Sequence, residues 1–337
     1  MITGITGQDG AYLANWLVMQ DYEVFGLMRR SSSNNLKRLE YMLNDITLLY
    51  GDITDAFSIT KALRESEPDE VYNLAAQSHV HVSFFNPQYT GQVDALGTTN
   101  LLECIMQEDH SNMKLYQAST SELFGNSPAP QNELTPFDPR SPYAIAKQYS
   151  FNMIKNYRES YKLHASNGIL FNHESPFRGS EFVTRKITTG LANMATGNIN
   201  TLHFGNIDSK RDWGHAKDYT QGMWKILQQD VPDDYVLATG ESHTVREFIE
   251  ESLEYYNVSI EWDGEGIDEI GYIKEFTRSR TIPSIKIDPR LYRPNEVHHL
   301  CGDYSKAKRV LDWEPNVDFK SLVREMTEYD FLSISRQ

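Results

Sequence analysis

The first half of the chain alternates short apolar runs with longer segments in which apolar residues recur at helical spacing. The apolar runs predict strands over Glu23–Met28, Ile46–Tyr50, Glu70–Ala76, Lys114–Ala118 and Ala165–Phe171. The segments between them predict helices over Ala11–Gln20, Ile53–Glu65, Val93–Gln107 and Pro142–Tyr161. Strands that alternate with helices form a parallel sheet through right-handed connections, so helices cover both of its faces. The fold class predicted is therefore α/β, with a doubly wound parallel sheet.

After about residue 172 the pattern is looser. Here the spacing predicts helices over Ile187–Met194, Asp218–Gln229, Val245–Tyr256, Ser305–Leu311 and Lys320–Leu332. Gly264–Arg280, rich in glycine and charged residues, is predicted to be a surface loop. We expect one domain over 1–172 and a smaller α/β domain over 173–337, with segments at about 205–240 and 295–310 crossing back to the first.

The expected helix ends carry capping residues. Thr54 or Asp55 precedes the second helix, and Thr244 precedes Val245. At the N-terminus, Met1–Thr3 leave almost no room for the buried strand that normally precedes a glycine turn. We therefore expect either a very short first strand or a few residues before those printed.

Composition sets the broad class of protein. The chain has 337 residues, of which 39% are hydrophobic and 23% charged, as in ordinary soluble globular proteins. A net charge of -15 argues against binding nucleic acid or an anionic membrane surface. Cys104 and Cys301 are too few for a disulfide framework, and neither they nor the ten histidines show metal-ligand spacing. No signal peptide or long apolar run appears, so we expect a cytoplasmic protein without a metal.

A glycine-rich turn stands near the start, where a strand should turn into a helix. In Gly4-x-x-Gly7-x-x-Gly10, each glycine lacks a Cβ, which lets backbone N–H groups approach a pyrophosphate at the helix N-terminus. A tight turn without any ligand is the alternative. The strand, helix and second strand that follow in order favour dinucleotide binding.

Basic residues stand where the second strand ends. Arg29, Arg30, Ser31 and Ser32 occupy the position at which an NAD enzyme usually carries an acidic residue for the ribose hydroxyl. Guanidinium and hydroxyl groups suit a 2′-phosphate better than a neutral diol, so NADP is favoured. A solvated basic turn is the alternative. Asp52, after the third strand, is placed to bond the adenine amino group.

Two further clusters supply candidate acid–base chemistry. Tyr143 and Lys147 share one face of a predicted helix, where the ammonium is expected to lower the pKa of the phenol. Thr120 and Glu122 follow the Lys114–Ala118 strand, at the edge where α/β sheets bind ligands. Thr120 could bond a reacting hydroxyl and Glu122 could remove a carbon-bound proton; a chance Tyr-x-x-x-Lys pair and a helix cap are the alternatives. A carboxylate beside the tyrosine suggests oxidation that serves a further step, such as elimination of water.

These motifs, with the Asn172–Ser175 run Asn-His-Glu-Ser and the Lys210–His215 run Lys-Arg-Asp-Trp-Gly-His, span nearly the whole chain in order. Together they resemble the extended short-chain dehydrogenases that modify nucleotide sugars, and within that group the family of GDP-mannose 4,6-dehydratases. The two runs are much more specific than the glycine turn.

The resemblance implies a Rossmann-type fold and a set of site residues. The catalytic residues would be Thr120, Glu122, Tyr143 and Lys147. NADP would be bound by Gly4, Gly7, Gln8, Asp9, Gly10, Arg29, Arg30, Ser31, Ser32, Asp52, Ile53, Leu74, Ala76, Gln77, Tyr89, Lys147, His173 and Arg178. GDP-mannose would be bound by Ser78, Asn172, Lys186, Arg211, Arg293 and Glu296.

The implied reaction needs both bases. Tyr143 would take the proton of the sugar's 4-hydroxyl while NADP⁺ takes hydride from C4. Glu122 would remove the acidified C5 proton and help water leave from C6. Return of hydride to C6 would give GDP-4-keto-6-deoxy-mannose and regenerate the cofactor.

The chain departs from the family pattern at three places, of which the short stretch before the glycine turn is one. Phe177 stands where relatives carry an arginine, and the segment Asn34–Leu39 differs in a loop that reaches a neighbouring subunit in tetrameric relatives. Homodimer and homotetramer both stay open. So do three alternative functions: a dehydratase of a GDP-linked heptose, a nucleotide-sugar 4-epimerase or 4-keto reductase, and a catalytically idle NADP-binding protein.

Overall fold

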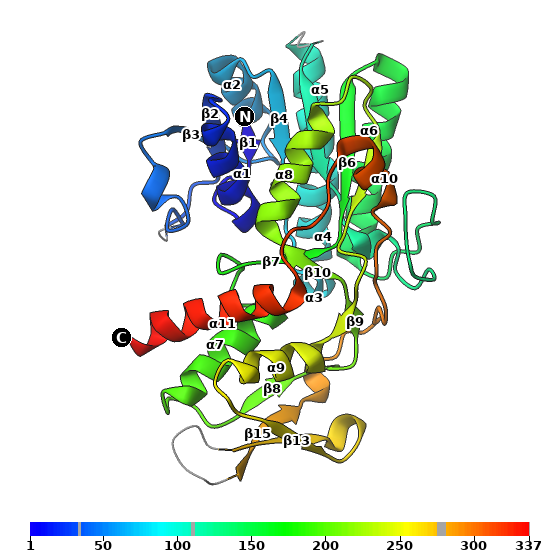
Figure 1. Ribbon diagram of the computed structural model, residues 1–337. Coiled ribbons are helices and arrows are strands. Elements are labelled where there is room, and N and C mark those ends of the chain that lie inside the picture. Colours follow the sequence, from blue (N-terminus) through cyan, green and yellow to red (C-terminus); the bar gives the residue numbers. More distant parts are fainter. Residues whose placement is uncertain (33–34, 109–111, 275–280, 337) are drawn as a thin grey trace.

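The computed structural model describes residues 1–32, 35–108, 112–274 and 281–336. Within them, seven parallel strands form one sheet in the order β11-β6-β5-β4-β1-β2-β3 (Figure 1). The strands are β1 Ile2–Thr3, β2 Val24–Met28, β3 Ile46–Tyr50, β4 Glu70–Asn73, β5 Lys114–Ala118, β6 His164–Leu170 and β11 Asp234–Leu237. The predicted doubly wound α/β sheet is confirmed.

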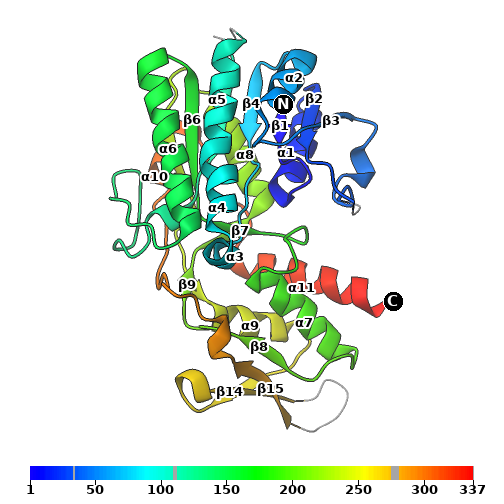
Figure 2. The ribbon, with the colours of Figure 1, turned by 180° about the vertical axis from the view of Figure 1, so that it is seen from behind.

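Helices cover both faces of this sheet, which explains why inner strands such as β4, β5 and β6 are buried along most of their length. The front face in Figure 1 carries α1 (Gln8–Met19) and α8 (Ala216–Leu227). The opposite face, turned forward in Figure 2, carries α2 (Ala56–Ser66), α5 (Gly97–Gln107) and α6 (Pro142–Tyr161). Each layer packs on its own buried apolar cluster.

The strand order reverses at β1, which lies between β2 and β4. The expected very short first strand is this two-residue β1. Thr3 joins the strands at the reversal, because its hydroxyl donates to Asn73 Oδ1 at 2.7 Å and accepts from the backbone N–H groups of Leu74 and Ala75. A crevice forms where neighbouring strands lead to opposite faces, so ligands bind at such a reversal.

A second body lies below the large sheet in Figures 1 and 2. Its sheet has the order β13-β14-β15-β8, formed by Ile260–Asp263, Ile270–Lys274, Thr281–Ile287 and Leu202–Phe204. Three helices pack with it around a buried cluster: α7 (Val183–Ala195), α9 (Val245–Glu254) and α11 (Phe319–Ser335).

The prediction of a surface loop over Gly264–Arg280 is wrong for Ile270–Lys274, which is strand β14; residues 275–280 lie outside the described part of the chain. β14 pairs with a strand on each side, and Gly271 and Ile273 alternate inward. The glycines and charges that flank this short alternation hid it in the sequence.

The predicted caps form where the sequence placed them. Asp55 accepts from the N–H of Phe57 at the start of α2, and Thr244 and Glu247 make a capping box on α9. α8 and β11 return to the large sheet after the chain has visited the second body. This path of the chain supports our proposal that two domains meet near residue 172 and that later segments cross back to the first domain.

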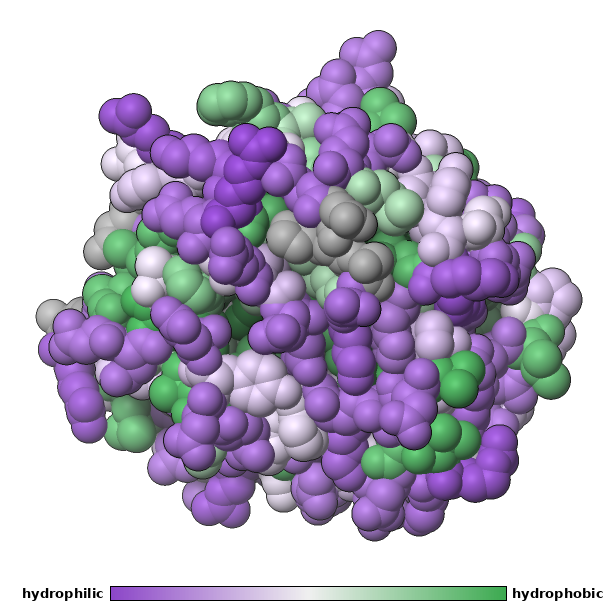
Figure 3. All heavy atoms as spheres, turned by 90° about the horizontal axis from the view of Figure 1, so that it is seen from above, coloured by the Kyte–Doolittle hydropathy of each residue, from purple (hydrophilic) through white to green (hydrophobic). Residues whose placement is uncertain are grey.

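The surface seen from above is mainly hydrophilic, with hydrophobic side chains gathered in small separate areas (Figure 3). In the described part of the chain, no helix combines the length and the apolar character that crossing a bilayer requires.

Candidate active site

A cavity of about 620 Å³ opens at the carboxyl ends of the parallel strands. The glycine turn and the ends of β2, β4, β5 and β6 form one side of it. The other side comes from the second half of the chain, with Lys186, Phe204, Arg211 and Arg293 among its lining residues. The cavity therefore lies at the strand reversal, between the large sheet and the second body.

Two of the three glycines in the turn occupy positions that no other residue fits. Gly4 has φ +69°, and a Cβ added to it would lie 2.9 Å from the backbone nitrogen of Ala75. A Cβ on Gly10 would lie 2.5 Å from Cα of Ile5. Gly7, the N-cap of α1, has no side chain to bond the free N–H groups of the first turn. The turn is thus an open cradle that suits a pyrophosphate.

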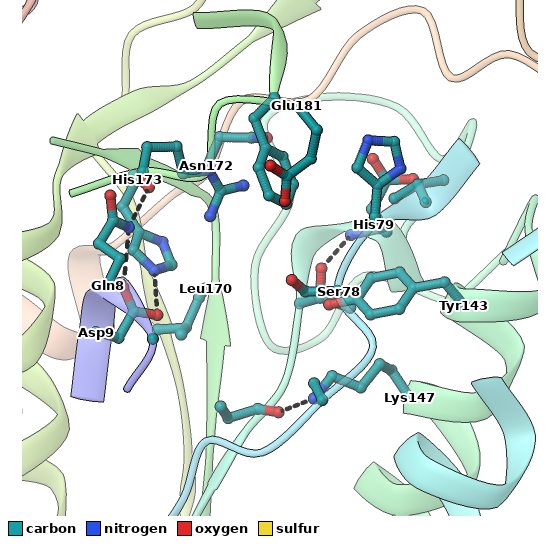
Figure 4. A pocket seen from close by; sticks show the side chains of 18 of the residues that line it. Gln8, Asp9, Ser78, His79, Tyr143, Lys147, Leu170, Asn172, His173 and Glu181 are labelled. Atoms are coloured by element: carbon teal, nitrogen blue, oxygen red, sulfur yellow. Dashed lines mark hydrogen bonds and ion pairs between the residues drawn. The ribbon is translucent and has the colours of Figure 1, made fainter. Parts of the chain in front are cut away.

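Beside this cradle lies an ion pair between the buried His173 and the partly exposed Asp9 (Figure 4). His173 Nε2 lies 2.9 Å from Asp9 Oδ2, and His173 Nδ1 lies 2.7 Å from the carbonyl oxygen of Phe171. Both acceptors demand a protonated nitrogen, so the ring is an imidazolium. Despite burial, Asp9 raises the pKa of His173, and His173 lowers the pKa of Asp9. The imidazolium offsets the carboxylate charge that an incoming phosphate would otherwise meet.

The basic residues after β2 are divided by the structure. Arg29 lines the cavity and its Nη1 donates to Tyr89 Oη at 2.5 Å, so two predicted cofactor residues meet. Asp52 lines the cavity as well, and its carboxylate accepts from the N–H and hydroxyl of Thr54. Among the described residues, Arg30, Ser31 and Ser32 are not part of the lining.

Tyr143 and Lys147 enter the cavity together from α6, on the side opposite His173 (Figure 4). Lys147 Nζ donates to the carbonyl oxygen of Ala118, at the end of β5, at 2.8 Å. The prediction that Lys147 lowers the pKa of Tyr143 is wrong: burial raises the pKa of this phenol, and Asp94 adds to the rise. A hydrogen bond with Thr120 acts in the opposite direction. Burial also lowers the pKa of Lys147.

Asp94 is a buried carboxylate behind this pair that the sequence did not single out. It lies on a π-helical turn, Gly91–Leu96, that precedes α5. Its Oδ1 accepts from the N–H of Gln77 at 2.7 Å, while Oδ2 is buried without a hydrogen bond. Burial raises the pKa of Asp94 to about 7. No motif in the sequence marks Asp94. Its place on a π-helical turn, a feature that is frequent at functional sites, is visible only in the structure.

Glu122 faces the second body across the cavity. It lies on a short 3₁₀ turn, Ser121–Leu123, and its N–H donates to the Thr120 hydroxyl at 3.2 Å. Its Oε1 lies 3.5 Å from Arg293 Nη1. Arg211 Nη2 lies 3.5 Å from Glu296 Oε1 in the same wall. Two carboxylates and two guanidiniums therefore face one another, and three of the four come from segments more than 80 residues after Glu122.

Arg178 is held by an acidic and an aromatic neighbour. Its Nε lies 3.1 Å from the buried Glu174 Oε2, and its guanidinium lies 3.6 Å from the centroid of the Phe182 ring. Arg185, another isolated basic residue in the sequence, has a different place: it pairs with Asp330 and donates to the carbonyl oxygen of Arg178. It therefore fixes the loop that carries Arg178.

The remaining predicted residues are placed as follows. Those that line the cavity are Ile53, Leu74, Ala76, Ser78, Asn172 and Lys186. Gln77 does not line it; its side chain bonds Thr90 and the backbone of His79, and so shapes the loop beside Ser78. Phe177 packs on Tyr12, and its carbonyl oxygen accepts from Arg38.

Sequence reasoning missed many of the lining residues, and Glu181 and His79 are two examples with ionisable side chains. Glu181 points into the cavity in Figure 4, from the loop before α7. His79 lines the cavity and also caps the helix Val80–Phe85 by accepting from the N–H of Val82. No motif marks either residue. In the part of the chain that the structure describes, no cluster of potential metal ligands is present.

The two most specific sequence runs prove to be neighbours. β7 (Asn172–Glu174) pairs in parallel with β10 (Trp213–His215), which brings the Asn-His-Glu-Ser and Lys-Arg-Asp-Trp-Gly-His runs together under the cavity. A family model described as GDP-mannose 4,6 dehydratase matches residues 1–326. The chain belongs to this family.

Proteins with the same description match the chain over nearly its whole length. The GDP-mannose 4,6-dehydratase of Vibrio cholerae is 51% identical, with 98% of this chain and 93% of that protein covered. The human GDP-mannose 4,6 dehydratase is 49% identical, with 98% and 90% covered. That of Drosophila melanogaster is 50% identical, with 98% and 85% covered.

Solved structures share the fold at lower identity. A Thermus thermophilus UDP-glucose 4-epimerase in complex with NAD superposes with a TM-score of 0.80 at 23% identity, covering 98% of this chain and 97% of that one. A dTDP-glucose 4,6-dehydratase from Bacillus anthracis in complex with NAD gives 0.79 at 20% identity, covering 97% and 94%. They confirm the Rossmann-type architecture.

Proposed function

We propose that the protein dehydrates GDP-mannose to GDP-4-keto-6-deoxy-mannose. The observation that carries the proposal is the meeting of Tyr143, Thr120 and Glu122 in one cavity with an open glycine cradle. Relatives described as GDP-mannose 4,6-dehydratases, about half identical over 98% of the chain, support the same reaction.

A nicotinamide dinucleotide fits the residues present, and we infer that it is NADP. The cradle of Gly4, Gly7 and Gly10 has space that any Cβ would fill, and Arg29 stands at the end of β2 where a 2′-phosphate is bound. The binding set proposed is the predicted one, in which Gln8 and Asp9 are fixed by His173 and Ser175. When bound, the oxidised ring supplies a hydride acceptor and a positive charge that favours the phenolate form of Tyr143.

The chain's own residues divide the proton transfers. Tyr143 accepts the proton of the 4-hydroxyl, while Thr120, bonded to the phenol, holds that hydroxyl in place. Lys147, whose ammonium is held by the carbonyl oxygen of Ala118, binds a ribose of the cofactor. Glu122 removes the C5 proton and then donates it to the hydroxyl that leaves C6 as water. The hydride taken from C4 would return to C6, and Tyr143 would give C5 the proton that it took from the 4-hydroxyl, so no net redox change would result.

The nucleotide end of the substrate needs cations. Lys186, Arg211 and Arg293 all line the far wall, and we propose that they bind the diphosphate. Burial lowers the pKa of Lys186 and of Arg211, so both gain from an anionic partner. Ser78 and Asn172 lie between this wall and the dinucleotide side, where the hexose would be held.

A panel of nucleotide sugars tests the proposal. The purified protein should convert GDP-mannose to a 4-keto product that carries one solvent deuterium at C5 after reaction in D₂O. UDP-, dTDP- and CDP-hexoses and a GDP-heptose are the comparison substrates. A C4 epimer formed without loss of water would indicate an epimerase. Preference for the heptose would indicate a heptose dehydratase, and NADP binding without turnover would indicate a catalytically idle protein.

We also infer that the protein is a homodimer or homotetramer. Apolar side chains stand exposed on neighbouring helices of one layer: Leu96 before α5, and Ile145 and Tyr149 on α6. Sedimentation of the wild type measures the assembly, and an Ile145→Glu variant should shift it toward the monomer. A wild type that sediments as a monomer refutes the inference.

A further inference from the structure

The contact between Glu122 and Arg293 joins two residues with separate expected tasks. Glu122 is the proposed base at C5, and Arg293 is a proposed ligand of the diphosphate. In the structure the two touch: Nη1 of Arg293 lies 3.5 Å from Oε1 of Glu122. The side chain of Glu122 is only 9% exposed, so its contact with the guanidinium is largely shielded from solvent.

Arg293 lies on a segment that crosses the cavity and is fixed at both ends. On one side, the 3₁₀ turn Pro289–Leu291 follows Asp288, whose N–H donates to the carbonyl oxygen of Phe204 at 2.8 Å. On the other side, the N–H of Lys210 donates to the carbonyl oxygen of His298 at 2.9 Å. We call the segment from Asp288 to His298 the strap. Because both of its ends are fixed, the guanidinium of Arg293 reaches Glu122 from a defined position.

Glu122 has few other means of holding its orientation. It lies on a single 3₁₀ turn, and its backbone N–H is bonded to Thr120. Arg211, the other guanidinium nearby, bonds the carbonyl oxygen of Lys210 and pairs with Glu296. The charge of Glu122 also acts on Arg211, but in the described part of the chain only Arg293 lies within ion-pair distance of the Glu122 carboxylate.

We propose that Arg293 is a positioning residue, which holds Oε1 of Glu122 and so directs Oε2 at the C5 proton of the hexose. The inference rests on the proposed function. It extends that function because the strap that binds the nucleotide end of the substrate also aligns the base for the elimination step. A carboxylate whose rotation is restricted in this way loses less entropy when the reaction geometry is reached.

The test compares Arg293→Gln with Arg290→Gln, a matched control from the same strap. Arg290 is 88% exposed, pairs with Asp288 and lies outside the cavity lining. Arg293→Gln should lower kcat about 100-fold, the usual cost of a misplaced catalytic group. It should also raise the isotope effect of a substrate deuterated at C5, since proton removal becomes the slow step. Arg293→Lys should recover part of kcat, and Arg290→Gln should match the wild type.

Two further arms separate positioning from simple binding. Lys186→Gln removes another cation from the same wall, and it should raise KM without raising the C5 isotope effect. The double variant Glu122→Gln/Arg293→Gln should be no slower than Glu122→Gln alone, because Arg293 acts through the carboxylate. If Arg293→Gln raises only KM, or if its loss adds fully to that of Glu122→Gln, the positioning role is overturned. A wild type inert toward GDP-mannose would instead refute the proposed function.

Discussion

Asp94→Asn probes the buried carboxylate behind the catalytic pair. Asn keeps the shape of the side chain and can still accept from the N–H of Gln77, which Oδ1 does at 2.7 Å. At the place of Oδ2, which is buried without a hydrogen bond, Asn carries an amide much like the neutral acid in size and polarity. The substitution therefore removes the titration of Asp94, together with the charge that acts on Tyr143 and Lys147.

The magnitude follows from the pKa of Asp94, which burial raises from 3.8 to about 7. A folded-state pKa above the unfolded one means that the protonated group stabilises the fold at low pH, and that this stability is lost as pH rises through the window between them. The full loss is about 4 kcal/mol at 1.36 kcal/mol per pH unit. Asp94→Asn should be nearly neutral at about pH 4 and relatively more stable by up to about 4 kcal/mol above about pH 8.

Urea unfolding of wild type and variant across this pH range measures the difference. The free energy of unfolding of the variant minus that of the wild type should rise steadily between about pH 4 and about pH 8. A difference that stays constant with pH would refute the reasoning, because it would mean that Asp94 has the same pKa in the folded and unfolded chain. Thermal melts at the same pH values give an independent check.

Three other predictions follow from the site. Glu122→Gln should still form some 4-keto intermediate but lose C5 exchange with solvent deuterium; unchanged turnover would remove Glu122 from the mechanism. Arg29→Ala should weaken NADP about 10- to 100-fold by titration while NAD changes little, because one charge-assisted phosphate contact is lost. Arg30→Ala is the control, since Arg30 is not part of the cavity lining; equal losses for NADP and NAD would contradict a role for Arg29 at the 2′-phosphate. His173→Gln should cost about 3 kcal/mol of unfolding free energy, because it leaves Asp9 without its partner. The cost should be greatest between about pH 4 and about pH 6: the raised pKa of His173 makes its share disappear as pH rises further, and the lowered pKa of Asp9 makes its share disappear as pH falls. A cost independent of pH would show that the pair is not ionised.

Most of the large sheet could be read from the sequence. The strands Ile46–Tyr50 and Lys114–Ala118 have the predicted bounds. Lys114–Ala118 lies inside the sheet with a buried centre, whereas Ile46–Tyr50 is a partly exposed edge strand that its short run of apolar residues still marks. Caps such as Asp55 and Thr244 were found for a similar reason: they act on N–H groups two or three residues away. Local interactions leave local signals.

The second body was harder to read. β14 is five residues long and is stabilised by pairing with β13 and β15. Its short alternation of buried and exposed residues is therefore too weak a signal to predict a strand from the sequence. Missed site residues have the same cause. Asp94 and Glu181 carry no motif, and their role depends on which segments fold against them.

The sequence alone determined the chemical groups: a glycine turn without Cβ atoms, a tyrosine and a lysine one helical turn apart, and a threonine and glutamate after a strand. It determined the family as well, because the order of the motifs along the chain can be recognised without knowledge of the fold. Only the tertiary structure decided their electrostatics. Burial, not Lys147, dominates the pKa of Tyr143, and the partner of Glu122 comes from a strap 171 residues later. Desolvation and through-space contact depend on distances in the folded chain, which spacing along the sequence does not contain.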